Sequence, residues 1–195
     1  GNVFKSLKFE EIDNEFINKK NSHSYIFYTN DFFSCQQDVL SLVKKLFKTH
    51  NLNLIQSDFV TISRNEKKQI LKDDMLELKN FFQNTSYIND YRVYLVEEAH
   101  KLNSSSANLI LKFLEEPTDH IIGFLVTNNK EKMLDTIISR CQNIKFIYDD
   151  KSKSDEKIKL MATEYLNQIE NDNSFLINKT LILNVITTRQ EVNNL

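Results

Sequence analysis

The sequence contains very little glycine or proline. Among 195 residues there are two glycines, Gly1 and Gly123, and one proline, Pro117. A phosphate-binding loop of the pattern GxxxxGK[ST] needs two nearby glycines, because the backbone must wrap closely around the phosphates. The two glycines lie at distant points of the chain, so the sequence excludes such a loop.

Cysteine, histidine and net charge are also low. The two cysteines and four histidines have no metal-ligand spacing, so we predict no metal site, no disulfide framework and no cofactor. A net charge of -2 argues against nucleic-acid binding through bulk charge. No apolar run approaches the ~20 residues of a membrane helix, and no signal peptide is visible. We therefore expect a cytoplasmic protein without membrane contact.

Short apolar runs alternate with longer periodic ones, which is typical of repeated βα units. The strands predicted from these runs cover residues 24–29, 91–96, 121–127 and 143–148, with a weaker extended stretch at 54–62. The predicted helices cover residues 36–49, 71–84, 130–138 and a segment that Asn103 or Ser104 caps and Pro117 ends. A charged linker at 149–156 separates an α/β core, residues 1–149, from a helical region, residues 150–195.

One apolar run ends in two carboxylates, Glu97 and Glu98, followed by Ala99 and His100. In open α/β sheets, ligands bind at the carboxyl ends of the strands. This pattern is typical of a strand that holds Mg²⁺ and a water beside a bound nucleotide. A pair of solvated acids at a strand end explains it equally well, and the missing phosphate loop weighs against nucleotide.

Two further polar segments are candidates for phosphate chemistry. Thr127 and Asn128 end a predicted strand, where a polar side chain either senses a γ-phosphate or forms a turn; Asn129 is a candidate helix cap. Ser139, Arg140 and Cys141 precede the last strand. An arginine there is either a finger that stabilises charge on a neighbour's phosphate or an ordinary surface residue. Spacing alone favours the surface residue.

Five segments in order resemble one family, the delta-prime subunits of the bacterial DNA polymerase III clamp loader. They are residues 23–27 (HSYIF), 91–102 (YRVYLVEEAHKL), 107–117 (ANLILKFLEEP), 125–129 (LVTNN) and 136–142 (TIISRCQ). These segments resemble, in turn, the family's opening HAYLF, its Walker B region, its ANALLKxLEEPP helix, its sensor 1 strand and its TIxSRCQ motif. Their order and spacing across one domain make the resemblance specific.

The resemblance implies an AAA+ α/β fold. The expected core is P-loop NTPase-like, with a parallel five-stranded sheet in the order 5-1-4-3-2. The start of a helical lid would follow it in residues 150–195, and the family's collar domain would be absent from this chain. The AAA+ assignment, the strand order and the lid do not follow from composition or periodicity.

The resemblance also implies a role in DNA replication. Arg140, positioned by Ser139 and Cys141, would act on ATP bound by a neighbouring gamma/tau subunit. The chain would be a non-catalytic part of the DNA polymerase holoenzyme, with gamma/tau and delta as partners and with the sliding clamp and primed DNA as indirect ones. It would bind no nucleotide itself.

Departures from the family pattern favour delta-prime over gamma/tau. Residues 29–36 read TNDFFSCQ. Cys35 stands where a phosphate-binding lysine would be, and Phe32 and Phe33 occupy the glycine turn. Glu97 replaces the usual aspartate in a degenerate Walker B motif, and the family's four zinc cysteines are missing.

Two alternatives stay open at this point. The chain could be a gamma/tau-type ATPase with an unusual nucleotide site around residues 30–36, or an adaptor subunit of another AAA+ assembly.

Overall fold

The computed structural model describes residues 5–6, 23–118 and 120–149, and the predicted region 150–195 lies outside them. Within this part of the chain, one parallel sheet has the order β1-β6-β2-β5-β4-β3. The strands are β1 (Lys5–Ser6), β2 (Ser24–Thr29), β3 (Phe59–Ile62), β4 (Arg92–Glu97), β5 (Ile121–Thr127) and β6 (Gln142–Phe146). The predicted α/β class and the predicted order 5-1-4-3-2 are confirmed in strands β6-β2-β5-β4-β3. Strand β1 was not predicted, because two residues carry no periodic signal.

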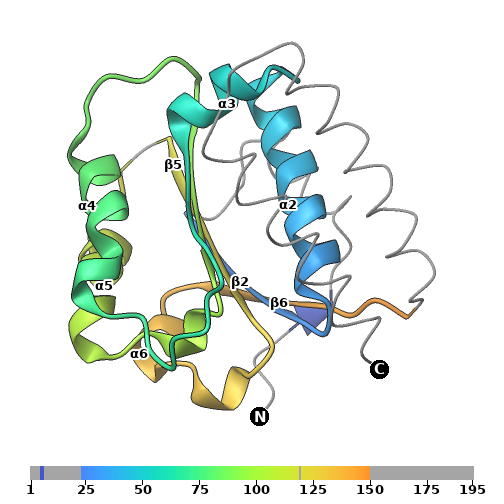
Figure 1. Ribbon diagram of the computed structural model, residues 1–195, viewed down its shortest axis with the longest axis vertical. Coiled ribbons are helices and arrows are strands. Elements are labelled where there is room, and N and C mark those ends of the chain that lie inside the picture. Colours follow the sequence, from blue (N-terminus) through green and yellow to red (C-terminus); the bar gives the residue numbers. More distant parts are fainter. Residues whose placement is uncertain (1–4, 7–22, 119, 150–195) are drawn as a thin grey trace.

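Helices cover both faces of the sheet, so the described part has three layers (Figure 1). The helical elements are α2 (Phe32–Phe47), α3 (Leu52–Asp58), η1 (Lys72–Met75), α4 (Leu76–Gln83), η2 (Ala99–Lys101), α5 (Ser104–Glu115), η3 (Lys130–Lys132) and α6 (Asp135–Ile138). Helices α2 and α3 pack on one face, and α4, α5 and α6 pack on the other. None of the described helices is long and apolar enough to cross a membrane.

Side chains alternate between the two layers along each strand. Tyr25 and Phe27 belong to the core beneath α2, whereas Ile26 between them belongs to the core beneath α5. Every residue of β4 and β5 is buried, as expected for central strands of a sheet covered on both faces. Gly123 lies opposite Tyr94, and a Cβ atom on Gly123 would come within 2.0 Å of the Tyr94 ring. Glycine at this position therefore makes room for a buried aromatic ring.

The segment between α2 and β4 corrects the sequence analysis. Residues 54–62 were predicted as extended, but they fold as the end of helix α3 followed by the short strand β3. Asn51 caps α3 by accepting a hydrogen bond from the backbone N–H of Asn53, and Leu52 and Ile55 are buried at helical spacing. The sequence reading missed this cap and merged the two elements.

Other boundaries also differ from the prediction. Helix α2 begins at Phe32, four residues earlier than predicted, because Asp31 caps it. Residues 130–138 were predicted as one helix but form η3 and α6, and the Asn129 side chain makes no capping hydrogen bond. Residues 71–84 begin with the 3-10 turn η1 before α4. Of the two candidate caps for α5, the structure selects Asn103, whose side chain accepts from the Ser106 N–H at 2.9 Å.

Candidate functional site

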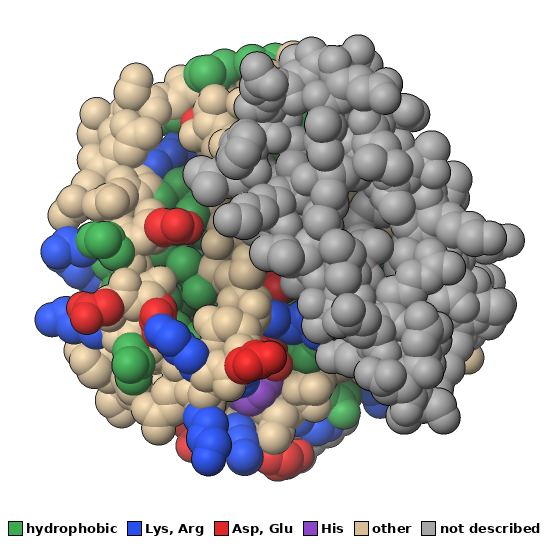
Figure 2. Space-filling view, viewed as in Figure 1, with side chains coloured by type: hydrophobic (Ala, Val, Ile, Leu, Met, Phe, Trp, Pro, Cys, Tyr) green, Lys and Arg blue, Asp and Glu red, His purple; other side chains and the backbone are tan. Residues whose placement is uncertain are grey.

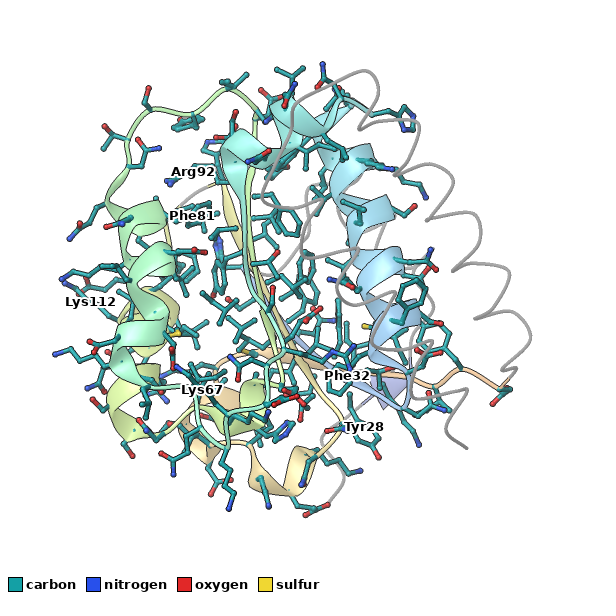
Figure 3. All side chains as sticks on the ribbon, viewed as in Figure 1. Tyr28, Phe32, Lys67, Phe81, Arg92 and Lys112 are labelled. Carbon is teal, nitrogen blue, oxygen red and sulfur yellow. The ribbon has the colours of Figure 1, made fainter. Side chains whose placement is uncertain are left out.

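The predicted site residues lie at two different ends of the strands. Glu97 and Thr127 end β4 and β5, so they share the carboxyl edge of the parallel sheet. Arg140 comes before β6, at the amino end of its strand. Tyr28 pairs with Thr127 on one side and with Lys145 on the other, so these residues lie at the same level of the sheet. Gln142, at the start of β6, is therefore about 10 Å of strand away from that level. Figure 3 shows the same polarity, with Tyr28 and Phe32 at one end of the molecule and Arg92, the first residue of β4, at the other.

At the carboxyl edge, the loop after β2 is closed by its own side chains. The Asp31 carboxylate accepts hydrogen bonds from the Ser34 backbone N–H at 3.1 Å and from the Ser34 hydroxyl at 2.8 Å. A carboxylate thus already lies at the N-terminus of α2, where backbone N–H groups and the helix dipole favour an anion. Phe33 and Cys35 are fully buried beneath it. The loop has neither a glycine turn nor a lysine directed at a phosphate.

Glu97 is buried and has a cationic neighbour. Its side chain is 2% exposed and accepts a hydrogen bond from the backbone N–H of Arg64 at 3.0 Å. The Arg64 Nε lies 3.9 Å from the same carboxylate oxygen, and its guanidinium carbon lies 5.0 Å from the centre of the Phe32 ring. The charge of Glu97 is therefore compensated within the chain, by a residue from the loop after β3.

Glu98, His100 and Thr127 form a second group at this edge. Glu98 has a left-handed backbone with φ 51°, and its carboxylate pairs with Lys101 at 2.7 Å. The Nδ1 atom of His100 lies 2.8 Å from the hydroxyl oxygen of buried Thr127, which also accepts from the Asn129 N–H at 2.9 Å. Burial lowers the pKa of His100, and neighbouring Glu98 opposes that shift. The lowered pKa favours a neutral imidazole, which shares a hydrogen bond with the Thr127 hydroxyl.

Arg140 is exposed at the other end of the strands. Its Nη1 donates to the Thr136 carbonyl at 2.8 Å, and its Nη2 lies 3.4 Å from a carboxylate oxygen of Glu115. The side chain keeps 37% of its surface accessible. The Ser139 hydroxyl donates to the same Thr136 carbonyl at 3.2 Å.

Cys141 follows Arg140 and is half-buried against the core beneath α5. Burial raises the pKa of its thiol to about 12, so the thiol is protonated at neutral pH. A protonated thiol is a poor nucleophile, which assigns Cys141 a packing role.

The structure brings some predicted residues together and leaves others apart. Glu97, Glu98 and Thr127 share one edge, and Asn128 is exposed beyond the end of β5. Ser139, Arg140 and Cys141 lie elsewhere. Among the described residues, no group of three or more His, Cys, Asp or Glu could hold a metal ion. On the face shown in Figure 2, described acidic and basic side chains are interspersed and form no broad patch of one sign.

Comparison with known proteins identifies the family. The family model described as "DNA polymerase III, delta subunit" matches residues 5–150. The chain belongs to this family. The match spans the whole described core, including the sheet, the closed loop after β2 and Arg140, and confirms the resemblance seen in the sequence.

Individual relatives of this DNA polymerase III family member are clamp-loader subunits. The delta' subunit of Bacillus subtilis is 33% identical over 96 residues, covering 49% of this chain and 27% of the relative. The gamma subunit of Buchnera aphidicola subsp. Baizongia pistaciae is 41% identical over 68 residues, covering 33% and 18%. The chain thus spans only part of the length of the relatives that it matches.

Solved structures support the fold. A gamma subunit-related protein from Thermotoga maritima has a TM-score of 0.61 at 21% identity, covering 79% of this chain and 50% of that one. The clamp loader delta protein of Bacillus subtilis has a TM-score of 0.53 at 9% identity, covering 95% and 58%. The fold of the family member is therefore that of the AAA+ clamp-loader subunits.

Sequence reasoning missed two residues that contact the predicted site. Arg64 lies two positions after Ile62, where both the predicted stretch and β3 end, but the loop after this strand was not considered as part of the site. Glu115 ends α5 and lies 25 positions before Arg140, so no local pattern links the two. The predicted strand order, with its second and third strands adjacent, could have located Arg64 at the carboxyl edge near Glu97, whereas only the tertiary structure shows the contact of Glu115.

Proposed function

We propose that this chain acts as a delta-prime-type subunit of the DNA polymerase III clamp loader. It hydrolyses no ATP itself and supplies Arg140 in trans to ATP bound by a neighbouring gamma/tau-type subunit. Its partners are then the gamma/tau and delta subunits, and the sliding clamp and primed DNA are reached through the assembly.

The observation that carries this proposal is a difference between the two ends of the sheet: polar groups are engaged within the chain at one end, and an arginine is accessible at the other. The carboxyl edge, where a nucleotide would bind, has its polar groups engaged by the chain itself: Asp31 with Ser34, and Glu97 with Arg64. Arg140 lies at the amino end of β6 and retains an accessible guanidinium. Arg140 does not face the carboxyl edge of the sheet in its own chain. In this proposal the ATP phosphate that Arg140 contacts is therefore bound by a neighbouring subunit.

The chemistry of such an arginine is electrostatic. A guanidinium presents donors in a planar fork that matches phosphate oxygens, and it carries its charge at every physiological pH. Placed beside a γ-phosphate, it stabilises the charge that develops during phosphoryl transfer, which is worth on the order of 10³-fold or more in rate. Arg140 would thereby couple hydrolysis in the neighbour to correct assembly of the interface.

The experiment replaces Arg140 in the full-length chain and measures ATP hydrolysis by the reconstituted clamp loader. For Arg140→Ala we expect hydrolysis at the adjoining site to fall by about 10³-fold, while the subunits still assemble. Lys112→Ala, which removes an exposed positive charge from α5, is the matched control and leaves hydrolysis unchanged. Equal hydrolysis with Arg140→Ala and with the native chain would contradict the proposal.

Calorimetry with Mg²⁺ and millimolar ATP tests the non-catalytic part separately. The isolated full-length chain should give no binding heat. Saturable binding at one site would show that the loop after β2 still holds phosphate, and would favour a gamma/tau-type ATPase with an unusual nucleotide site.

A further inference from the structure

Arg140 has a single acidic side chain next to it among the described residues, and that carboxylate comes from a different element. Glu115 is the last residue of α5, and its Oε1 lies 3.4 Å from Nη2 of Arg140. The Glu115 side chain is 58% exposed, so packing in the core does not fix its position. We propose that Glu115 is a positioning residue for Arg140, which rests on the trans role of Arg140 proposed above.

Contacts on two sides hold the guanidinium. Nη1 donates to the Thr136 carbonyl and to the Ser139 hydroxyl oxygen, and the Glu115 carboxylate lies beside Nη2. The carboxyl end of α5 also carries the negative end of the helix dipole, which favours a cation there. The fork of Arg140 is therefore oriented before any phosphate arrives, although much of its surface stays open to solvent.

Pre-orientation matters because a free arginine side chain loses rotamer entropy when it becomes ordered. Part of that cost is already met in the free subunit, so less is lost when the guanidinium meets a phosphate. An exposed ion pair is weak, so the contact between Arg140 and Glu115 can break when the guanidinium binds the phosphate. Glu115 thus orients the Arg140 side chain without preventing it from binding the phosphate.

The neighbouring carboxylate provides a matched control. Glu116 follows Glu115 directly and is also exposed, but the ion pair with Arg140 is made by Glu115. Removing either glutamate changes the net charge of the subunit by the same amount. A difference in ATP hydrolysis between the two variants therefore comes from the position of the carboxylate beside Arg140 and not from the change in net charge.

The test measures steady-state ATP hydrolysis by the clamp loader reconstituted with the full-length chain. For Glu115→Ala we expect kcat to fall about two- to fivefold with KM for ATP unchanged, since the neighbour binds the nucleotide. Glu115→Gln, which keeps the acceptor oxygen, should restore part of the loss. Glu116→Ala should match the native chain. In the Arg140→Ala background, Glu115→Ala should have no further effect.

The outcomes separate this inference from the proposed function. Loss of hydrolysis in Arg140→Ala with native kcat in Glu115→Ala would overturn the role of Glu115 alone. A higher kcat in Glu115→Ala would also overturn it, because the carboxylate would then restrain the arginine. Native hydrolysis in Arg140→Ala would overturn the proposed function itself. Thermal unfolding of Glu115→Ala should match that of Glu116→Ala, which excludes a loss of fold as the cause.

Discussion

The two ends of the sheet use similar side chains in opposite ways. At the carboxyl edge, Glu97 is 2% exposed, accepts a hydrogen bond from the backbone N–H of Arg64 and lies 3.9 Å from the Nε atom of Arg64. At the amino end of β6, the guanidinium of Arg140 and the carboxylate of Glu115 form a pair with 37% and 58% of their side chains exposed. Breaking the largely buried contact of Glu97 would destabilise the fold, whereas the exposed pair contributes little to stability and leaves a cation accessible. The same two charged groups serve structure or recognition according to burial.

Removing the buried carboxylate should have the largest effect on stability. Glu97→Ala removes a buried carboxylate that accepts the Arg64 backbone N–H and lies beside the Arg64 guanidinium, so we expect the free energy of unfolding to fall by about 3 kcal/mol, measured by urea denaturation. Glu98→Ala breaks only a partly exposed pair with Lys101 and should cost less than about 1 kcal/mol. Equal losses in the two variants would remove the distinction between buried and exposed acids at this edge.

Removing the cap of α2 should have an intermediate effect. Asp31→Ala leaves the Ser34 N–H without its acceptor and should lower the free energy of unfolding by about 1 kcal/mol. The variant should still give no binding heat with Mg²⁺ and ATP, because the buried side chains of Phe33 and Cys35 continue to replace the glycine turn and the lysine. Saturable ATP binding by Asp31→Ala would show that one carboxylate alone closes this edge.

The His100 group should make stability depend on pH. Burial lowers the folded-state pKa of His100 below its ordinary value of about 6.5, so below that pH the unfolded chain binds more protons than the folded one. Stability should therefore rise with pH through this window and fall as the pH drops. His100→Gln can keep a hydrogen bond to Thr127 and should flatten this slope in urea denaturation from pH 5 to 7. An unchanged slope would assign the pH dependence to other groups.

Removing the exposed arginine should have the smallest effect on stability. Arg140→Ala should change the free energy of unfolding by no more than about 0.5 kcal/mol in urea denaturation, since an exposed pair contributes little. A loss above about 1 kcal/mol would make Arg140 a structural residue and would complicate the reading of its effect on ATP hydrolysis.

Most of the fold could be predicted because its signals are local. Strands β2 and β5 match residues 24–29 and 121–127, since continuous apolar runs mark strands that are buried on both faces. Helix α3 was missed because its seven residues give few helical repeats before β3 begins. Residues 130–138 were predicted as one helix although η3 contains no apolar residue, because Met133, Leu134 and Ile137 have helical spacing.

The site could be predicted only in part. The motifs located Glu97, Thr127 and Arg140, but they did not reveal the partners of these residues. Arg64 and Glu97 are 33 positions apart, and His100 and Thr127 are 27 apart. Contacts over such separations depend on which strands are neighbours and in which register, and no window of sequence contains that information.

The sequence by itself determined that no glycine-rich phosphate loop exists, that the chain folds as an α/β core, and that an arginine stands before the last strand of that core. Those properties follow from residue identity and from local periodicity. Only the tertiary structure decided that Asp31 and Arg64 engage the groups at the carboxyl edge, and that Arg140 stays open beside Glu115. The physical reason is burial, because the sheet encloses one acid and leaves the other in water, and neither environment is written in the residues themselves.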